Sequence, residues 1–168
     1  SWNDFYRWML ELQERNTTLE MILREPRQKV GRGLFAWWLG EYHCSFMQEF
    51  GLKPQQTVLD FGCGYGRTAI PLIKYLDSGK FIGSELSEKR LRLAEEWVKR
   101  EGLETCEPTF IASTDNTMSF LQDGTIDVIW TLSVVTHMPE KEMREVLGAF
   151  HRVLKESGVV YFHYNSPT

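Results

Sequence analysis

The sequence predicts an α/β protein in which helices cover a mostly parallel sheet, with a helical segment in front of it. Two observations carry this prediction. From Pro54 onward, short apolar runs alternate with amphipathic stretches of helical period, which is typical of βαβ units with right-handed crossovers. In addition, the segment VLDFGCGYGR at residues 58–67 joins the first apolar run to a helix through three alternating glycines.

Length, charge and cysteine content narrow the class of protein. A chain of 168 residues suits one domain, and its net charge of −4 gives no basic field for a polyphosphate. The charge therefore disfavours nucleic acid as a partner. No apolar run approaches the ~20 residues of a membrane span, and the N-terminus lacks a secretory pattern. Three scattered cysteines fit a reducing cytoplasm and disfavour structural zinc, so we expect a cytoplasmic protein without a metal.

Residues 1–50 are expected to form a helical cap, and residues 51–168 the α/β core. The apolar stripe of the first helical stretch consists of Trp2, Phe5, Met9, Leu12, Leu19, Ile22 and Leu23, and Pro26 ends it. After a loop at residues 31–33, a second amphipathic stretch runs from Phe35 to Phe50, with Gly51 in the C-cap position. We expect its many aromatic side chains to pack against the sheet or neighbouring helices.

Five strands and four helices are expected in the core. The strands are residues 57–61, 80–84, 109–112, 126–132 and 158–163, and the helices are residues 67–76, 88–101, 116–122 and 139–155. Ser87 is placed to N-cap the second of these helices, and Pro139 suits the first turn of the last one.

The glycine segment lies where ligands bind in open parallel sheets, outside the carboxyl ends of the strands. Gly62, Gly64 and Gly66 allow a positive φ and a close approach of ligand to backbone. Their GxGxG spacing departs from the GxGxxG dinucleotide fingerprint, whose third glycine would fall at Arg67, so an NAD-dependent enzyme is disfavoured. Glu85 ends the second strand, where a carboxylate can accept hydrogen bonds from both hydroxyls of a ribose.

These motifs resemble those of a known family. VLDFGCGYGR, followed by FIGSELSEKRLRLAEEW at residues 81–97, is similar to the first two cofactor motifs of class I S-adenosylmethionine-dependent methyltransferases. IDVIWTLSVVTHMPEKEMREVLGAFHRVLKESGVVYF at residues 126–162 extends the resemblance. It implies a Rossmann-like sandwich with strand order 3-2-1-4-5, and the cofactor S-adenosylmethionine with S-adenosylhomocysteine as product.

The resemblance also implies roles for individual residues at the methionine end of the cofactor. Asp60 would lie near the methionine amino group, directly or through water. The loop containing Gly62, Cys63, Gly64 and Gly66 would wrap the methionine and ribose portions, and the backbone near Leu132 and Ser133 would face the methionine end. Cys63 needs only to be small there, so we expect a structural role for it and not a catalytic one.

At the nucleoside end, the resemblance implies that Glu85 binds the ribose hydroxyls and Leu86 packs on the adenine. The family often has an acid after the third strand for the adenine amino group, and here Thr114 stands at that position with Asp115 one residue later. Asp115 can reach the adenine after a small loop shift. A helix-capping role explains Asp115 equally well.

The expected activity is methyl transfer to a small-molecule acceptor, in which positioning carries much of the rate. His137, just after the fourth strand, is the candidate general base, although hydrogen bonding at a helix start is the interpretation that we favour for it. The alternative function is a noncatalytic cofactor-binding sensor or scaffold. The two last strands of the family are missing, so we expect a fragment whose fifth-strand edge is covered by another segment or partner chain.

Overall fold

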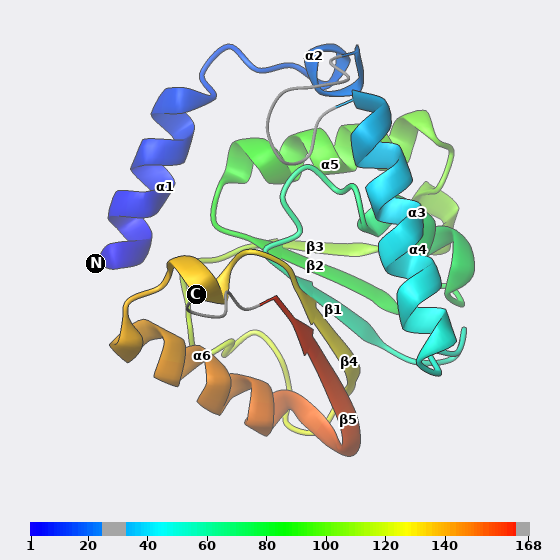
Figure 1. Cartoon of the computed structure of the whole chain (residues 1–168), viewed down its shortest axis with the longest axis vertical. Helices are drawn as coiled ribbons and strands as arrows, with labels where there is room; N and C mark the ends of the chain where they lie inside the picture. Colours follow the sequence, from blue (N-terminus) through cyan, green and yellow to red (C-terminus); the bar gives the residue numbers. More distant parts are fainter. Residues whose placement is uncertain (25–32, 164–168) are drawn as a thin grey trace, which may run out of the picture.

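The computed structural model describes residues 1–24 and 33–163, with only the backbone described for residues 24 and 33–37. Its centre is a parallel sheet of five strands in the order β3-β2-β1-β4-β5 (Figure 1). The strands are β1 (Val58–Phe61), β2 (Phe81–Glu85), β3 (Thr109–Ala112), β4 (Ile126–Thr131) and β5 (Leu154–Phe162). The predicted fold class and strand order are confirmed.

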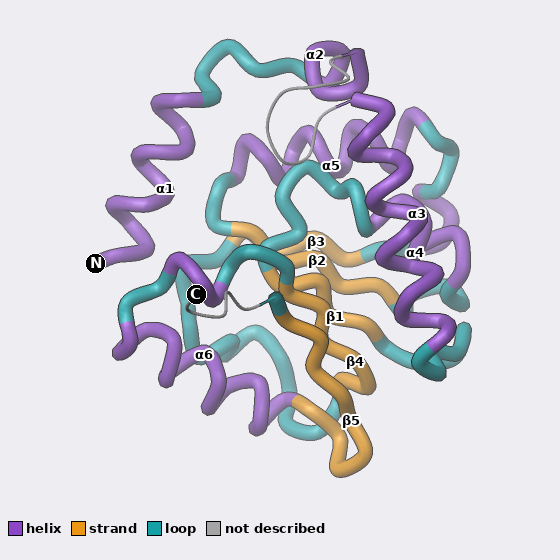
Figure 2. The backbone as a smooth tube through the Cα atoms, viewed as in Figure 1, coloured by secondary structure: helices purple, strands orange, loops and turns teal. Residues whose placement is uncertain are grey.

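Helices cover both faces of this sheet. The helices of the described residues are α1 (Trp2–Gln13), α2 (Leu19–Arg24), α3 (Gly33–Glu49), α4 (Ala69–Tyr75), α5 (Glu88–Arg100) and α6 (Glu140–Val153), with short 3₁₀ helices at Glu104–Cys106 and Val135–His137. As Figure 1 shows, α3, α4 and α5 lie on one side of the sheet and α6 on the other. Figure 2 shows α1 beyond the strand ends, joined to α2 by a loop (Figure 2).

Two hydrophobic clusters, one on each face, follow from the alternation of side chains along the strands. Val58 belongs to the cluster under α2–α5, whereas the next residue, Leu59, belongs to the cluster under α6. Both are fully buried. The first cluster also takes in Leu19 and Ile22 of α2 and Met47 of α3. The helical segment before residue 50 therefore shares its core with the sheet, and the boundary expected at that residue stays a prediction.

The strand order creates the crevice expected of such sheets. β1 pairs with β2 on one side and with β4 on the other, with Val58 opposite both Phe81 and Val128. The chain leaving β1 and the chain leaving β4 therefore diverge to opposite faces. Ligands of open parallel sheets bind in the crevice at such a switch point.

The expected stripe of the N-terminal helix is wrong in two respects. α1 ends at Gln13, and α2 begins only at Leu19. Moreover, the side chains of Phe5 and Leu12 are 52% exposed, while Asn3 and Leu10 are buried. The helical period predicts which side chains share a face but not which face meets the protein, and here a polar contact of Asn3 decides it. Pro26, residues 31–32 of the expected loop and the Phe35 side chain lie outside the described part, whereas the backbone of Gly33 is described and begins α3.

The helix expected at residues 116–122 is also wrong, because the structure has turns there. The Asp115 carboxylate accepts hydrogen bonds from the N–H and the hydroxyl of both Thr117 and Ser119, and Met118 adopts a φ of 53°. These side-chain bonds to the backbone replace helical ones. Asp115 therefore caps a turn. Met118 and Leu121 still reach the core beside α6.

The other boundaries differ by a few residues. Ser87 N-caps α5 as expected, by accepting a hydrogen bond from the Arg90 N–H, and Gly51 follows α3 with a φ of 99°. β5 begins at Leu154, directly after α6, which is earlier than expected. In the described residues β5 is an edge of the sheet, and the covering of this edge stays a prediction. No helix in the described residues has the length and apolarity that a membrane crossing needs.

Candidate functional site

A cavity of about 320 Å³ lies at the carboxyl ends of the strands, where the switch point is. Its wall combines the glycine loop, the residues after β2, β3 and β4, and one face of α1. The residues predicted from the sequence that line it are Asp60, Gly62, Cys63, Gly64, Glu85, Leu86, Thr114, Asp115, Leu132, Ser133 and His137. The fold thus brings together residues that are up to 77 positions apart in the chain (137 − 60).

The three glycines of the loop have different roles. All have a positive φ, which is 81° at Gly62, 58° at Gly64 and 87° at Gly66. A Cβ on Gly62 would lie 2.3 Å from Val134 Cγ2, whereas one on Gly64 would meet nothing within 4 Å. Gly66 does not line the cavity, and a Cβ there would lie 3.0 Å from the Cβ of Ala94 in α5. Gly64 therefore leaves ligand space open, and Gly66 lets the loop pack on α5.

Glu85 connects the end of β2 to the glycine loop. Its side chain is buried, with Oε2 accepting a hydrogen bond of 3.0 Å from the Gly64 N–H and Oε1 accepting one of 3.0 Å from the Ser87 N–H. Each carboxylate oxygen has lone pairs for a further donor. Glu85 therefore fixes the loop and still presents acceptor capacity to the cavity that it lines.

Asp60, the last polar residue of β1, is buried in the cavity wall, and its Oδ2 has no hydrogen-bond partner among the described residues. Burial raises the pKa of this carboxyl to about 7, with the Arg67 charge opposing the rise and the Glu85 charge adding to it. Burial likewise lowers the pKa of the Arg67 guanidinium, against the effect of Asp60. The Asp60 carboxyl is thus poised between its neutral and charged forms near neutral pH.

Sequence reasoning missed Arg67, which it treated only as a misfit to the dinucleotide spacing. Arg67 lines the cavity, and its Nη1 is buried without a hydrogen-bond partner among the described residues. The signal available was a long cationic side chain directly after a loop of small residues. Because Gly66 already provides the close packing on α5, position 67 is free to carry a large side chain.

α3 supports the same loop from outside. A Cβ on Gly40 would lie only 2.0 Å from the Arg67 carbonyl oxygen, so helix and loop touch directly. One turn later, His43 Nδ1 lies 3.1 Å from Thr68 Oγ1, and the His43 ring centroid lies 4.8 Å from that of Trp130. Burial, followed by the Arg67 charge, lowers the pKa of His43 to about 4. His43 is therefore a neutral, structural residue at pH 7.

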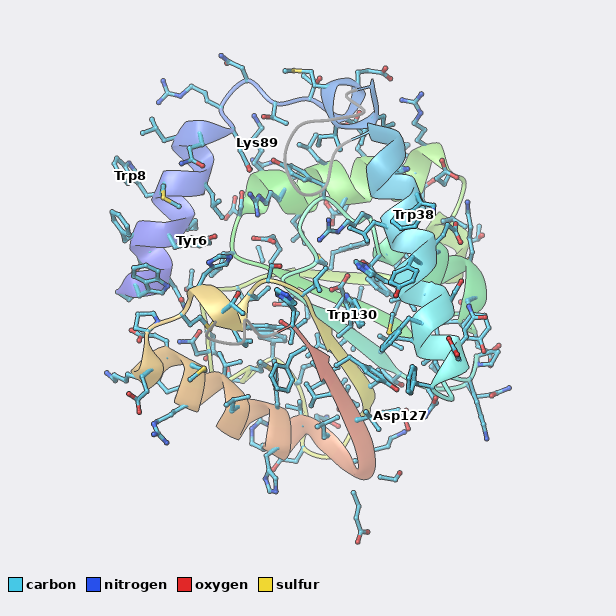
Figure 3. The ribbon with its side chains drawn as sticks, viewed as in Figure 1. Tyr6, Trp8, Trp38, Lys89, Asp127 and Trp130 are labelled. Atoms are coloured by element: carbon cyan, nitrogen blue, oxygen red, sulfur yellow. The ribbon has the colours of Figure 1, made fainter. Side chains whose placement is uncertain are left out.

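α1 forms one wall of the cavity with Trp2, Asn3, Tyr6 and Leu10. Asn3 Nδ2 donates hydrogen bonds of 2.8 Å to the Thr114 carbonyl oxygen and to Asn116 Oδ1. Figure 3 shows Tyr6 on the inner side of α1 and Trp8 pointing outward (Figure 3). Trp8 is 58% exposed. The hydrogen bonds of Asn3 therefore tie the N-terminal end of α1 to the loop after β3.

The other end of α1 is held by the start of α5. Arg90 Nε donates a hydrogen bond of 3.0 Å to Glu14 Oε2, and the Arg90 Cζ lies 5.2 Å from the centroid of the Tyr65 ring. Lys89 Nζ donates to the backbone carbonyl oxygens of Glu14 and Arg15. We call the contacts of Glu14 with Arg90 and Lys89 the clasp. Neither the clasp nor the Asn3 contacts are visible in the sequence, because their partners are remote.

The remaining predicted residues also line the cavity. Ser133, two residues after the end of β4, adopts a φ of 56°. His137 ends the 3₁₀ helix Val135–His137, with its N–H donating to the Val134 carbonyl oxygen at 3.0 Å. The pKa of the Cys63 thiol is raised well above its ordinary value by burial, followed by the charges of Asp60 and Glu85. Cys63 is therefore a protonated thiol, not an activated nucleophile.

Fold and site together define a Rossmann-like protein whose cavity suits a nucleoside-containing ligand. In the described residues, no group of His, Cys, Asp or Glu is arranged to hold a metal ion. A family model described as a methyltransferase domain matches residues 58–158. The chain belongs to this family, the class I S-adenosylmethionine-dependent methyltransferases.

Individual relatives agree with this assignment. The chain is 30% identical over 111 residues to sterol 24-C-methyltransferase from Aspergillus fumigatus, covering 66% of this chain and 28% of that protein. It is 33% identical over 113 residues to 2-methyl-6-phytyl-1,4-hydroquinone methyltransferase from Synechocystis, covering 65% and 32%. The chain thus spans about a third or less of the length of these two relatives.

Solved structures show the same fold. Magnesium protoporphyrin IX methyltransferase from Synechocystis, solved with bound S-adenosylmethionine, has a TM-score of 0.64 and 20% identity, covering 88% of this chain and 69% of that one. A phosphoethanolamine N-methyltransferase from Haemonchus contortus has a TM-score of 0.71 and 14% identity, covering 95% and 31%. At such identities the likeness concerns the fold.

Proposed function

We propose that this chain binds S-adenosylmethionine in the cavity at the strand ends and transfers its methyl group to a small-molecule acceptor. The observation that carries the proposal is the placement of two acids, Asp60 and Glu85, on the wall of one cavity together with the open backbone of Gly64. Membership of the methyltransferase family supports the choice of cofactor.

The chain's own residues suit the parts of this cofactor. Glu85 would accept hydrogen bonds from the ribose hydroxyls with the lone pairs that Gly64 and Ser87 leave unused. Asp60 would accept from the methionine ammonium, which supplies the partner that its Oδ2 lacks. Leu86 would pack on the adenine. Thr114 and Asp115 would border it, although the Asp115 oxygens already accept four hydrogen bonds from Thr117 and Ser119.

The bound cofactor would supply an electrophilic methyl group, and the protein would supply position. Holding the acceptor in line behind the methyl group converts a bimolecular reaction into an effectively unimolecular one. α1 would cover the cavity and exclude water, with Trp2, Tyr6 and Leu10 on the wall. This role gives the segment 1–50 a function as cap. His137, which also lines the cavity, would accept a proton only from acceptors that must lose one.

We further propose that the acceptor is largely apolar. Aromatic side chains of α1 and β4, Trp2, Tyr6 and Trp130, contribute to the cavity wall. Flat apolar surface of this kind suits a ring system or a lipid-like molecule. The relatives named above methylate a sterol and a prenylated hydroquinone according to their names. The acceptor is therefore expected among such compounds.

The test is transfer of an isotopically labelled methyl group from S-adenosylmethionine to a panel of sterols, quinols and polar amines. We expect labelled product from an apolar acceptor and greatly reduced product with Glu85→Ala. Glu88→Ala is the matched control and should retain activity. It removes an exposed ion pair with Arg92 within α5, three residues after Glu85. Cofactor binding without transfer to any acceptor class would favour the noncatalytic alternative, and absence of binding would refute the proposal.

A further inference from the structure

Asp60 and Arg67 present opposite charges to the same cavity, and the protein satisfies neither completely. Both residues line the cavity. Asp60 Oδ2 and Arg67 Nη1 are buried, and each lacks a hydrogen-bond partner in the part of the chain that the structure describes. A buried charged group without a partner is costly. The wall therefore offers an unused acceptor at Asp60 and an unused donor at Arg67.

The Asp60 and Arg67 side chains interact electrostatically, although their unpaired atoms form no hydrogen bond with each other. Beyond the effect of burial, the Arg67 charge lowers the Asp60 pKa, and the Asp60 charge raises the Arg67 pKa. They are therefore near neighbours. The unpaired atoms are nevertheless not bonded to one another. A ligand that carries an ammonium and a carboxylate on the same carbon atom, as an α-amino acid does, would satisfy both at once.

The backbone that carries Arg67 is fixed before any ligand arrives. Gly40 of α3 lies directly against the Arg67 carbonyl, and His43, one turn further along α3, contacts the hydroxyl of Thr68. A guanidinium on such a support loses little freedom on binding. Its planar fork can also donate two parallel hydrogen bonds to a carboxylate, which a lysine cannot do.

We propose that Arg67 binds the carboxylate of the amino-acid portion of S-adenosylmethionine, opposite Asp60, which takes the ammonium. This inference rests on the proposed function and adds a residue to which the motifs assign no role. It makes the chain selective for the complete zwitterion. Sulfonium or thioether nucleosides without the carboxylate would leave the Arg67 donor buried and unpaired, and would bind less tightly.

The proposal is tested first with the unmodified chain, by titration calorimetry with three probes. These are S-adenosylhomocysteine, its decarboxylated analogue, and 5′-methylthioadenosine, which lacks the whole amino-acid portion. We expect S-adenosylhomocysteine to bind about tenfold to a hundredfold more tightly than the decarboxylated analogue, as for a charge-assisted hydrogen bond. Equal affinities would overturn the proposal, because they would show that the Arg67 donor does not bind the carboxylate. Failure of all three to bind would refute the proposed function itself.

Variants then assign the effect to the residue. Arg67→Gln should lose about tenfold or more in affinity for S-adenosylhomocysteine, with affinities for the decarboxylated analogue and 5′-methylthioadenosine unchanged. Arg144→Gln, which removes an exposed arginine paired with Glu140, is the matched control. Equal weakening of all three probes in Arg67→Gln would indicate a merely structural role and overturn the proposal. Should Arg67→Gln not fold, Arg67→Lys keeps the charge without the fork and should weaken S-adenosylhomocysteine alone.

Discussion

Gly40 of α3 packs on the backbone carbonyl of Arg67, with no space for a side chain between them. A Cβ built on Gly40 would lie 2.0 Å from that carbonyl oxygen and 2.9 Å from the carbonyl carbon. The contact joins the helix before the sheet to the loop after β1. It sets the position of the residue that follows the last loop glycine, and with it one wall of the cavity.

The first prediction concerns this contact. Gly40→Ala should destabilise the chain by about 1–3 kcal/mol, because backbone must move to admit the methyl group. Gly148, in the middle of α6, has nothing within 4 Å of its Cβ position. Gly148→Ala should therefore stabilise by about 0.5–1 kcal/mol through helix propensity alone. Denaturant unfolding measures both, and changes of the same sign in the two variants would argue against the contact.

A second prediction follows from the Asp60 pKa of about 7. Only the charged carboxylate attracts the ligand ammonium, so affinity for S-adenosylhomocysteine should rise by about tenfold between pH 6 and pH 8. The neighbouring Arg67 stays charged throughout this interval. Asp60→Asn should abolish the rise and bind weakly at both values. Calorimetry at three pH values checks this, and a flat profile in the unmodified chain would contradict the assigned role.

The raised pKa of Asp60 also affects the free energy of unfolding. Its pH dependence is opposite in sign to that of a carboxylate whose pKa is lowered by folding. The native carboxyl holds its proton up to about pH 7, whereas in the unfolded chain it is ionised above about pH 4. The native state thus binds more protons in this interval, so Asp60 lowers stability as pH rises through it. In the ligand-free chain, Asp60→Asn should therefore be more stable than the parent at pH 7, with a smaller difference at pH 4. Urea unfolding at the two pH values measures it, and a variant that is less stable at pH 7 would count against the shift.

A fourth prediction concerns the clasp. The Glu14 and Arg90 side chains are 9% and 23% exposed, so this ion pair is largely buried. Removing one partner of a fully buried ion pair costs roughly 3–5 kcal/mol of stability. Glu14→Gln should release α1, seen as hydrogen exchange at its amides about tenfold faster or more, because few other contacts hold this helix. Glu88→Gln removes a pair that is 64–66% exposed and should change exchange little. Unchanged exchange in Glu14→Gln would show that the clasp does not hold α1.

The sheet was predictable from the sequence because its signals are local. Each apolar run, such as residues 126–131 of β4, lies beside its own helix and turn, and their alternation fixes parallel pairing. The loop glycines and the acids at the ends of β1 and β2 were predictable for the same reason, since their positions relative to strand ends decide where they lie. Their roles in binding stay predictions.

What the sequence could not provide depends on contacts between remote segments. The outward face of α1 follows from the bonds of Asn3 to the loop after β3, 111 residues away for Thr114. The turn at residues 116–122 follows from the carboxylate of Asp115, whose competing bonds override an amphipathic pattern. Arg67 lies in the cavity wall where Gly66 packs on α5 and Gly40 admits the Arg67 backbone, two contacts between remote segments.

The central claim is that Gly64 keeps space open for S-adenosylmethionine and its product, and titration calorimetry with S-adenosylhomocysteine tests it most directly. The variants are Gly64→Ala and Gly124→Ala, whose glycines have φ values of 58° and 63° and nothing within 4 Å of the added methyl group. Both variants should suffer the same backbone strain of about 1–2 kcal/mol, but only Gly64 lines the cavity. We predict binding by the unmodified chain and Gly124→Ala, and loss of about tenfold or more in Gly64→Ala. Equal binding by the two variants, or none by the folded unmodified chain, would contradict the account.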